Sequence, residues 1–378
     1  MTSDAAGLPT SHPSPRGFSL TLGVEEEFQL VHEDSGQPAP YADAVLARAA
    51  KLPSPGDGST LHGELLMSMA ESATGICTDL AQVRRQLTGA RSRLARAARE
   101  EGVRLLALGV RPSPAAPRHI SPTEHYESMH QMYGHLVAET ETCGCHVHVG
   151  TLDKDQAVTS NNHLRPWLPT LLALSANSAF HNGIDTGYAS WRTIALSRWP
   201  TTQMPPHFTS VDHYEETFAA LHRGGVLPAG ANAYWWARPS RRLPTVEIRV
   251  ADVSPTVDGA VLQAGLSRAL VHTALNAPTQ QHRSRHDDQL LTAALWTAAR
   301  HGIRGPALHP HSGHQTLAAD LAQELLIALR PALREIGDWE EVEHLLADAL
   351  RDGRQTGSET GTVLTEGPKR RRKLALEP

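Results

Sequence analysis

Three consecutive glutamates, Glu25, Glu26 and Glu27, lie inside a segment at residues 21–31 in which apolar and polar side chains alternate. This alternation predicts a β-strand, in which neighbouring side chains point to opposite faces. Glu25 and Glu27 then share the polar face, where two carboxylates can bind a divalent cation. Glu26 falls on the apolar face, so we expect it to pair with an arginine or to lie at a sheet edge. An acidic triplet is more often a solvated surface, and only the strong strand pattern favours the metal interpretation.

Two later alternating segments carry polar pairs of the same kind. His146 and His148 share one face of a strand expected at residues 145–150, and Glu247 and Arg249 share one face of another. Carboxylates with one or two imidazoles suit Mg²⁺ or Mn²⁺ better than zinc, and an arginine beside them suits a phosphate or a carboxylate. Two histidines on a half-exposed strand are as often structural as functional, so this pair alone decides nothing.

Glu64 and Glu71 form a further acidic pair whose geometry is ambiguous. They are seven residues apart, so an unbroken strand would place them on opposite faces. A β-bulge or a helical turn between them would restore a common face. One ligand with one surface residue is the alternative. Arg192 and Arg198 lie in a stretch at residues 183–206 that glycines and prolines punctuate, which predicts a long functional loop.

The elements that must position these residues follow from the remaining periodicity. Strand-like and helix-like segments alternate without a strict βαβ rhythm, which predicts an α+β fold with a mainly antiparallel sheet. The sequence contains neither a G-x-G-x-x-G motif after a strand nor a P-loop, so a nucleotide would have to be held in another way. Further strands are expected at residues 103–110 and 246–252, and helices at residues 78–101, 167–182, 260–276, 287–301, 316–328 and 339–350.

The composition is that of an ordinary globular protein. The chain has 378 residues and a formal net charge of −5, which argues against general affinity for nucleic acid. Three cysteines without framework spacing indicate a reducing compartment. The sequence has no apolar run that could span a membrane and no secretory signal, so a cytoplasmic protein is expected. We expect a single domain at residues 18–353, between a flexible N-terminal arm at residues 1–17 and a flexible basic tail at residues 354–378.

The order of these motifs resembles the type 2 glutamate–cysteine ligase family, whose members are also called carboxylate–amine ligases. The resemblance covers residues 18–350, nearly the whole chain. Each motif is weak by itself, whereas five of them in the same order are specific. They are Gly23-Val24-Glu25-Glu26-Glu27-Phe28; Glu64 with Glu71, Thr74 and Cys77; Gly144-Cys145-His146-Val147-His148-Val149-Gly150; Asn177-Ser178 followed by Asp185 to Ser190 and Ser197-Arg198-Trp199-Pro200; and Pro244-Thr245-Val246-Glu247-Ile248-Arg249-Val250-Ala251-Asp252.

The resemblance implies a fold and a reaction. The fold is glutamine synthetase-like: ATP and divalent metals lie on the concave face of a curved, mainly antiparallel sheet, and helices pack on its other side. In the reaction, a carboxylate attacks the γ-phosphate of ATP, and an amine then displaces phosphate from the acyl phosphate. Mg²⁺ is the implied metal, with Mn²⁺ as the alternative.

The resemblance also implies roles for single residues. By motif position, Arg249 and Arg192 would stabilise charge on the transferred phosphoryl group. His148 and Arg198 would contact the nucleotide together with Arg249. Glu64 and Glu71 would have to converge, so a bulge is expected between them. The implied metal ligands are Glu25, Glu27, Glu64, Glu71, His146 and Glu247.

The substrates are left open. Nominally the family joins glutamate and cysteine to γ-glutamylcysteine, and the alternative is another small-molecule acid–amine pair of specialised metabolism. A metal-dependent hydrolase built on His146 and His148 would need more imidazoles, and the sequence has no H-E-x-x-H motif. A non-catalytic relative that binds a nucleotide would be expected to lack the metal glutamates. The sequence predicts no nucleic-acid or membrane partner, and it leaves a homodimer open.

Overall fold

The computed structural model describes residues 20–113, 118–228, 230–277 and 287–355. Its centre is a sheet of seven strands in the order β2-β3-β1-β5-β9-β8, with β4 paired to the C-terminal half of β1. Every pairing in this sheet is antiparallel, which confirms the predicted α+β class. The strands are β1 (Leu22–His32), β2 (Thr60–Gly63), β3 (Met69–Ala73), β4 (Val103–Leu106), β5 (Gly144–Gly150), β8 (Ala237–Pro239) and β9 (Thr245–Asp252).

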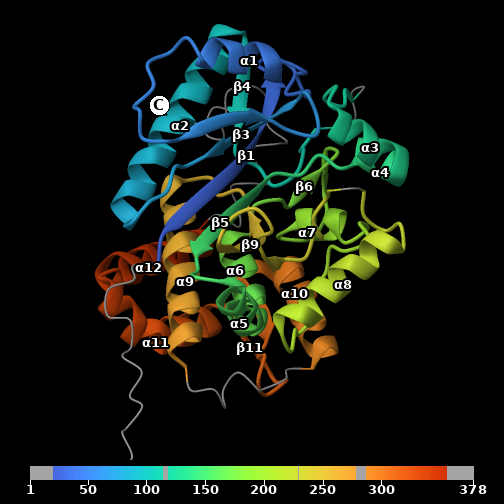
Figure 1. Cartoon of the computed structure of the whole chain (residues 1–378). Helices are drawn as coiled ribbons and strands as arrows, with labels where there is room; N and C mark the ends of the chain where they lie inside the picture. The colour runs from blue at the N-terminus through green and yellow to red at the C-terminus, as the bar shows by residue number, and fades with distance from the viewer. Residues whose placement is uncertain (1–19, 114–117, 229, 278–286, 356–378) are drawn as a thin grey trace, which may run out of the picture.

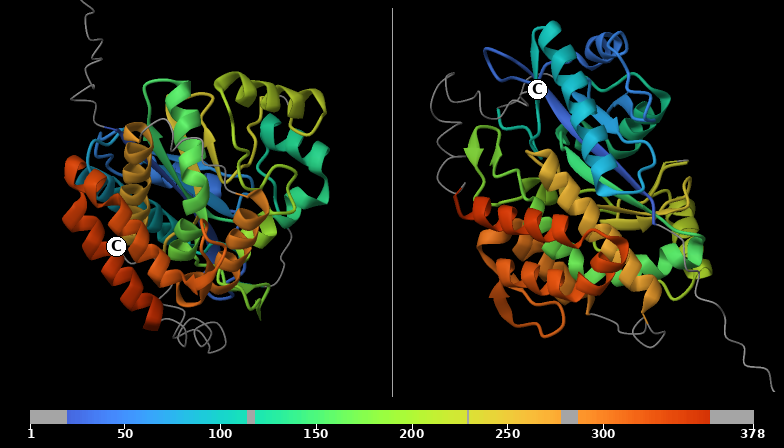
Figure 2. Two further views of the ribbon diagram at one scale, coloured as in Figure 1. Left: turned by 90° about the horizontal axis from the view of Figure 1, so that it is seen from below. Right: turned by 90° about the vertical axis from the view of Figure 1, so that its left-hand side faces the viewer.

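Helices cover one face of this sheet in two layers (Figures 1 and 2). α2 (Leu80–Glu100) and α9 (Val257–Asn276) run along the strands, together with α5 (Lys154–Leu164) and α6 (Leu168–Ser175). An outer layer packs against α6 and α9 and consists of α10 (Asp288–His301), α11 (Ala318–Ile336) and α12 (Trp339–Gln355). The remaining elements are α1 (Ala42–Ala49), α3 (Glu124–Tyr133), α4 (His135–Glu139), α7 (Trp191–Leu196), α8 (Val211–Arg223), the 3₁₀ turns η1 (Arg165–Trp167) and η3 (Gly302–Arg304), and the short pairs β6 (Phe180–His181) with β7 (Ile184–Asp185) and β10 (Pro306–Leu308) with β11 (Gln315–Leu317).

The alternation of the strands decides which face of the sheet is dry. Val24, Val147 and Ile248 lie on neighbouring strands and pack with side chains of α2, α6 and α9 in the main hydrophobic cluster. Because successive side chains of a strand point to opposite faces, the polar residues between them lie on the face that these helices leave free.

One charged pair crosses the dry face. Arg91 on α2 donates from Nε to the Glu26 carboxylate at 2.9 Å, and both side chains are buried. The same guanidinium donates to the carbonyl of Ser254 at 3.0 Å. This contact confirms that Glu26 points away from its neighbours and pairs with an arginine. It also ties α2 to β1, since a buried carboxylate needs such a partner.

Several expected elements differ in extent. The helix expected at residues 167–182 ends at Ser175, because the Asn177 N–H donates to the Asp252 carboxylate at 2.9 Å instead of continuing the helix. The strand expected at residues 103–110 ends at Leu106. α11 continues through Pro331, since its apolar stripe is buried on both sides of the proline.

Two expectations of chain organisation lie largely outside the described residues. These are the flexible arm at residues 1–17 and, beyond the end of α12, the flexible tail. Within the described part of the chain, no helix combines the length and the apolar character needed to cross a bilayer.

Candidate active site

The polar face of the sheet carries a connected row of titratable side chains on β1, β5 and β9. The strand register places Glu25 opposite His146, and His148 opposite Glu247. One oxygen of Glu25 lies 3.5 Å from Nδ1 of His146, and the other lies 3.4 Å from Nε2 of His148. Burial would raise the pKa of Glu25, but hydrogen bonds with the two histidines outweigh burial and lower this pKa below its ordinary value. Glu25 is therefore ionised at neutral pH.

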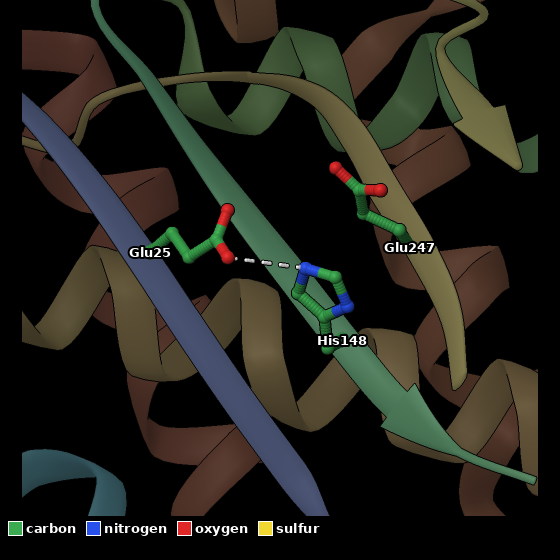
Figure 3. Close-up of side chains that lie close together, drawn as sticks. All are labelled: Glu25, His148 and Glu247. Atoms are coloured by element: carbon green, nitrogen blue, oxygen red, sulfur yellow. Dashed lines mark ion pairs between the residues drawn. The ribbon is translucent and has the colours of Figure 1, made fainter. Parts of the chain in front are cut away.

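Glu25, His148 and Glu247 form a candidate cation site (Figure 3). Each offers one ligand atom, and these atoms lie within 4.8 Å of one another. Nδ1 of His148 lies 3.0 Å from the Thr245 hydroxyl, which orients the ring so that Nε2 faces Glu25. Nε2 of His146 is buried and has no hydrogen-bond partner among the described residues. Two carboxylates and one imidazole nitrogen around one point fit Mg²⁺ or Mn²⁺.

A second group of carboxylates, Glu27, Glu64 and Glu71, lies beside this site. Glu27 is directly opposite Glu71 in the register of β1 and β3. Glu64 follows the last residue of β2, and β2 pairs antiparallel with β3, so reversal of the chain brings Glu64 to Glu71. The predicted bulge is therefore wrong, since both registers of β3 are continuous. A hairpin, which the strand pattern did not reveal, produces the convergence.

These three carboxylates repel one another. Burial, followed by repulsion from Glu64, raises the pKa of Glu27 to about 8. Burial and the same neighbour raise the pKa of Glu71 to about 10. Such groups can ionise together only when a cation compensates their charge. A cation beside the trio would therefore relieve this repulsion, although among the described residues the group whose three ligand atoms lie within 4.8 Å of one another is Glu25, His148 and Glu247.

Glu247 joins two arginines to the row. Nε of Arg238 donates to Oε2 of Glu247 at 2.8 Å, and Arg249 donates to Oε1. Burial would raise the pKa of Glu247, but Arg238 and Arg249 outweigh it and lower this pKa well below its ordinary value. Burial, followed by repulsion from Arg249, lowers the pKa of His146 to about 4, so this ring is neutral. Arg238 is not among the predicted site residues, because β8 is too short for its alternation to be recognised.

Arg192 reaches the site from the first turn of α7. Its Nη2 donates to the carbonyl of Arg249 at 3.2 Å. Asp252, fully buried at the end of β9, accepts hydrogen bonds from the hydroxyls of Ser178 at 2.7 Å and Ser190 at 2.8 Å. Ser190 caps α7, and the Ser178 hydroxyl accepts the N–H of Arg192 at 3.1 Å. Asp252 thus fixes the start of α7, a role that sequence reasoning missed although Asp252, Ser178 and Ser190 all lie in the motifs of the resemblance.

Arg198 does not join this row. Its Nη1 donates to Glu139 at 2.7 Å and its Nε donates to the carbonyl of Ala195 at 3.1 Å. It is absent from the linings of the two cavities described next. The region expected to be a loop contains α7, which ends at Leu196, so Arg192 lies within the helix whereas Arg198 lies two residues beyond its end. The geometry therefore does not support the predicted contact of Arg198 with a nucleotide.

Two cavities open at opposite ends of the row. The Glu25 cavity has a volume of about 180 Å³, and the Glu27 cavity has a volume of about 220 Å³. The Glu25 cavity is lined by Thr21, Leu22, Gly23, Val24, Glu25, Ala73, Thr74, Gly75, Ile76, His148, Leu243, Pro244 and Thr245. The Glu27 cavity is lined by Glu27, Glu64, Leu65, Met69, His125, Tyr126, Met129, Thr140, Thr142, His146, Arg192, Leu196, Trp199, Tyr234 and Arg249.

Comparison with known sequences identifies the family. The profile described as "Glutamate-cysteine ligase family 2 (GCS2)" matches residues 21–362. The chain belongs to this family. It is an amide-forming ligase of glutamate–cysteine ligase family 2, as the resemblance implied. It is 44% identical over 352 residues to "Putative glutamate–cysteine ligase 2-2" of Saccharopolyspora erythraea, covering 93% of this chain and 90% of the relative. It is 41% identical over 336 residues to "Putative glutamate–cysteine ligase 2" of Salinispora arenicola, covering 89% of this chain and 88% of the relative.

Solved structures share the fold of this family 2 ligase. A bifunctional glutathione synthetase from Pasteurella multocida superposes with a TM-score of 0.63 at 15% identity, covering 94% of this chain and 52% of that one. The family 2 chain thus corresponds to about half of that bifunctional enzyme. A glutamate–cysteine ligase from Francisella tularensis, solved in complex with AMP, superposes with a TM-score of 0.60 at 12% identity, covering 94% of this chain and 87% of that one. These neighbours share the predicted α+β fold with a mainly antiparallel sheet.

Proposed function

We propose that this ligase joins a small carboxylic acid to an amine with ATP and Mg²⁺, through an acyl phosphate. The observation that carries the proposal is the row of carboxylates and imidazoles between two cavities of different chemistry. Phosphoryl transfer requires cations and positioning more than side-chain acid–base chemistry. A row of metal ligands with an apolar hollow at one end and arginines at the other meets that requirement.

The Glu25 cavity would hold the nucleotide. Most of its lining surface is apolar, and two aliphatic side chains lie at its rim: Ile76 is 80% exposed and Leu243 is 52% exposed. An apolar hollow with exposed aliphatic side chains suits a purine base. The phosphates of a nucleotide bound there would extend along the row past His148 and Glu247 towards the Glu27 cavity.

The row would hold Mg²⁺ in two places. Glu25, His148 and Glu247 would bind one ion, and Glu27, Glu64 and Glu71 with His146 would bind a second. When bound, Mg²⁺ neutralises charge on phosphate oxygens. Mn²⁺ takes the same ligands and is the alternative. Glu25 and Glu247 are already ionised and His146 is neutral, so these ligands need not lose a proton to bind a cation.

Arg249 and Arg192 would act on the reacting groups. Both line the Glu27 cavity next to the row, where they would orient the acid and stabilise charge on the transferred phosphoryl group. An oxygen of the acid would bond to the γ-phosphorus as ADP leaves. The amine would then attack the acyl carbon, phosphate would leave, and the new amide nitrogen would lose a proton.

Glutamate and cysteine are the first acid–amine pair to test, because the curated relatives carry their names. The experiment combines the full chain with ATP, Mg²⁺ and a panel of acids and amines, and measures phosphate and, by mass spectrometry, the amide. We expect ADP, phosphate and amide only when acid, amine and Mg²⁺ are all present. Phosphate without an amine would indicate a hydrolase, and nucleotide binding without any phosphate release would indicate a non-catalytic relative.

A further inference from the structure

Part of the lining of the Glu27 cavity has no role in the chemistry proposed above. We call it the apolar wall. Its side chains lie outside the polar row and come from β3 and its preceding turn, from α3, and from the segments at the end of α7 and before β8. Most of them belong to the hydrophobic cluster around Phe28, so the wall is an open edge of the core. The wall consists of Leu65, Met69, Met129, Leu196, Trp199 and Tyr234.

The polar atoms of the two rings in the wall already have partners within the protein. Nε1 of Trp199 donates to the Thr140 hydroxyl at 2.9 Å, and the Tyr234 hydroxyl donates to Sδ of Met129 at 3.8 Å. The Trp199 and Tyr234 rings also pack on each other, with centroids 5.3 Å apart. The wall therefore offers a ligand mainly hydrocarbon and ring surface.

We propose that the apolar wall binds the side chain of the acceptor amine, and that this side chain is branched aliphatic or aromatic. This inference rests on the proposed function. Arg192 and Arg249 lie at the row, so they take the carboxylate that is phosphorylated, whereas the side chains of the wall lie outside the row. Glu27, Glu64 and His146 also line this cavity, and they would hold the second Mg²⁺. The apolar surface left for the side chain of the acceptor is the wall.

The wall makes cysteine a poor fit. The short side chain of cysteine would leave most of the apolar wall in contact with water. Burial of apolar surface is the main favourable contribution to the binding free energy at this wall. An apolar pocket discriminates between two ligands that differ by one methylene by roughly 10–200-fold. Leucine and phenylalanine should therefore be preferred over cysteine and alanine by at least about tenfold.

The test measures binding, so it does not depend on turnover. Isothermal titration of the full chain with Mg²⁺ and a non-hydrolysable ATP analogue is carried out with L-leucine, L-phenylalanine, L-cysteine and L-alanine. We expect the first two amines to have a Kd at least about tenfold lower than the last two. Equal or tighter binding of cysteine or alanine overturns the inference. So does the absence of binding by every amine when the ATP analogue binds.

Variants locate the preference on the wall. Met129→Gln keeps the length of the side chain and makes it polar, and Tyr234→Ala removes a ring; each should reduce the preference for phenylalanine over alanine to about threefold or less. Ile327→Ala, at an exposed position of α11, is the matched control and should keep the full preference for phenylalanine over alanine. Circular dichroism checks folding, and if both wall variants unfold, the comparison of amines on the unmodified protein decides.

The failure of this inference differs from the failure of the proposed function. Loss of amine-dependent phosphate release across the whole panel would contradict the ligase reaction. A preference for cysteine, with phosphate release intact, would contradict only the assignment of the wall.

Discussion

At the scale of single residues, the row separates two kinds of carboxylate. Glu25 and Glu247 are held ionised by histidines and arginines. Glu27 and Glu71 have raised pKa values because they are buried beside Glu64. The first kind is ready to bind a cation, whereas the second kind needs a cation to be ionised at neutral pH. The two kinds therefore respond differently to mutation and to pH.

Glu27→Gln should abolish turnover and leave the fold intact. The Gly144 N–H donates to Oε2 of Glu27 at 2.6 Å, and a glutamine carbonyl can accept the same bond. The variant loses a charge that would bind Mg²⁺, so we expect kcat/KM to fall by about 100-fold or more in the phosphate-release assay. Glu343→Gln, on the exposed side of α12, is the control. Near-normal activity of Glu27→Gln would remove this residue from the site.

The stability of the metal-free protein should fall as the pH rises. The pKa of Glu27 is about 8 in the folded protein and 4.5 ordinarily, so between these values the folded state binds more protons than the unfolded state. Stability is then full below pH 4.5 and is lost as the pH rises towards 8, at up to about 1.4 kcal/mol per pH unit for each such group. The raised pKa of Glu71, about 10, extends the loss to higher pH.

Calorimetry of the protein with a chelator tests this pH dependence between pH 5 and pH 9. Saturating Mg²⁺ should restore stability most at the alkaline end, where the carboxylates are free of protons. Glu27→Gln should flatten the metal-free curve. A metal-free stability that rises over this range would show that the carboxylate trio is not buried together.

At the scale of elements, strand periodicity predicted more than loop composition did. The alternation in β1, β5 and β9 assigned Glu25, His146 and Glu247 to one face and Glu26 to the other, because burial of one face forces that pattern. The convergence of Glu64 and Glu71 needed a hairpin whose turn has no glycine–asparagine signal. α7 and the apolar wall depend on contacts between distant segments, which local sequence does not encode.

Asp252→Asn should weaken catalysis through α7. The carboxylate accepts two serine hydroxyls that fix the start of this helix, and it lies 3.9 Å from Nη1 of Arg192. With an amide, one of these hydroxyls loses its acceptor and Arg192 loses its counter-charge. We expect kcat to fall by roughly 10–100-fold, because Arg192 is then poorly positioned.

The KM for ATP distinguishes the mispositioning of Arg192 from a disruption of the whole site. It should change little in Asp252→Asn, since neither Asp252 nor Arg192 lines the Glu25 cavity. Asp287→Asn is the matched control: Asp287 caps α10 and lies outside both cavity linings, and asparagine is an equally good cap. A proportional rise in the KM for ATP would show that Asp252 acts on the whole site and not on Arg192.

At the scale of the whole molecule, one sheet connects two cavities that recognise different groups. The helices on its dry face hold β1, β5 and β9 in register, so the distance between the cavities is set by rigid elements (Figure 2). Binding at each end should therefore be separable by mutation, because the row between the cavities does not depend on the rim of either. The two linings share no residue, and sites that share no partner usually contribute additively.

Ile76→Ser and Leu243→Ser test this separation from the nucleotide end. Both side chains are exposed and line the Glu25 cavity, so their replacement removes apolar contact with the base at little cost to folding. Each should raise the KM for ATP by roughly tenfold, which corresponds to about 1.4 kcal/mol, and leave the preference among amines unchanged. Met129→Gln should reduce the preference among amines and leave the KM for ATP unchanged. The variant that combines Ile76→Ser, Leu243→Ser and Met129→Gln should show the higher KM and the reduced preference together. A change in amine preference in Ile76→Ser, measured by competition between two amines and mass spectrometry of the products, would mean that the two ends of the row are coupled.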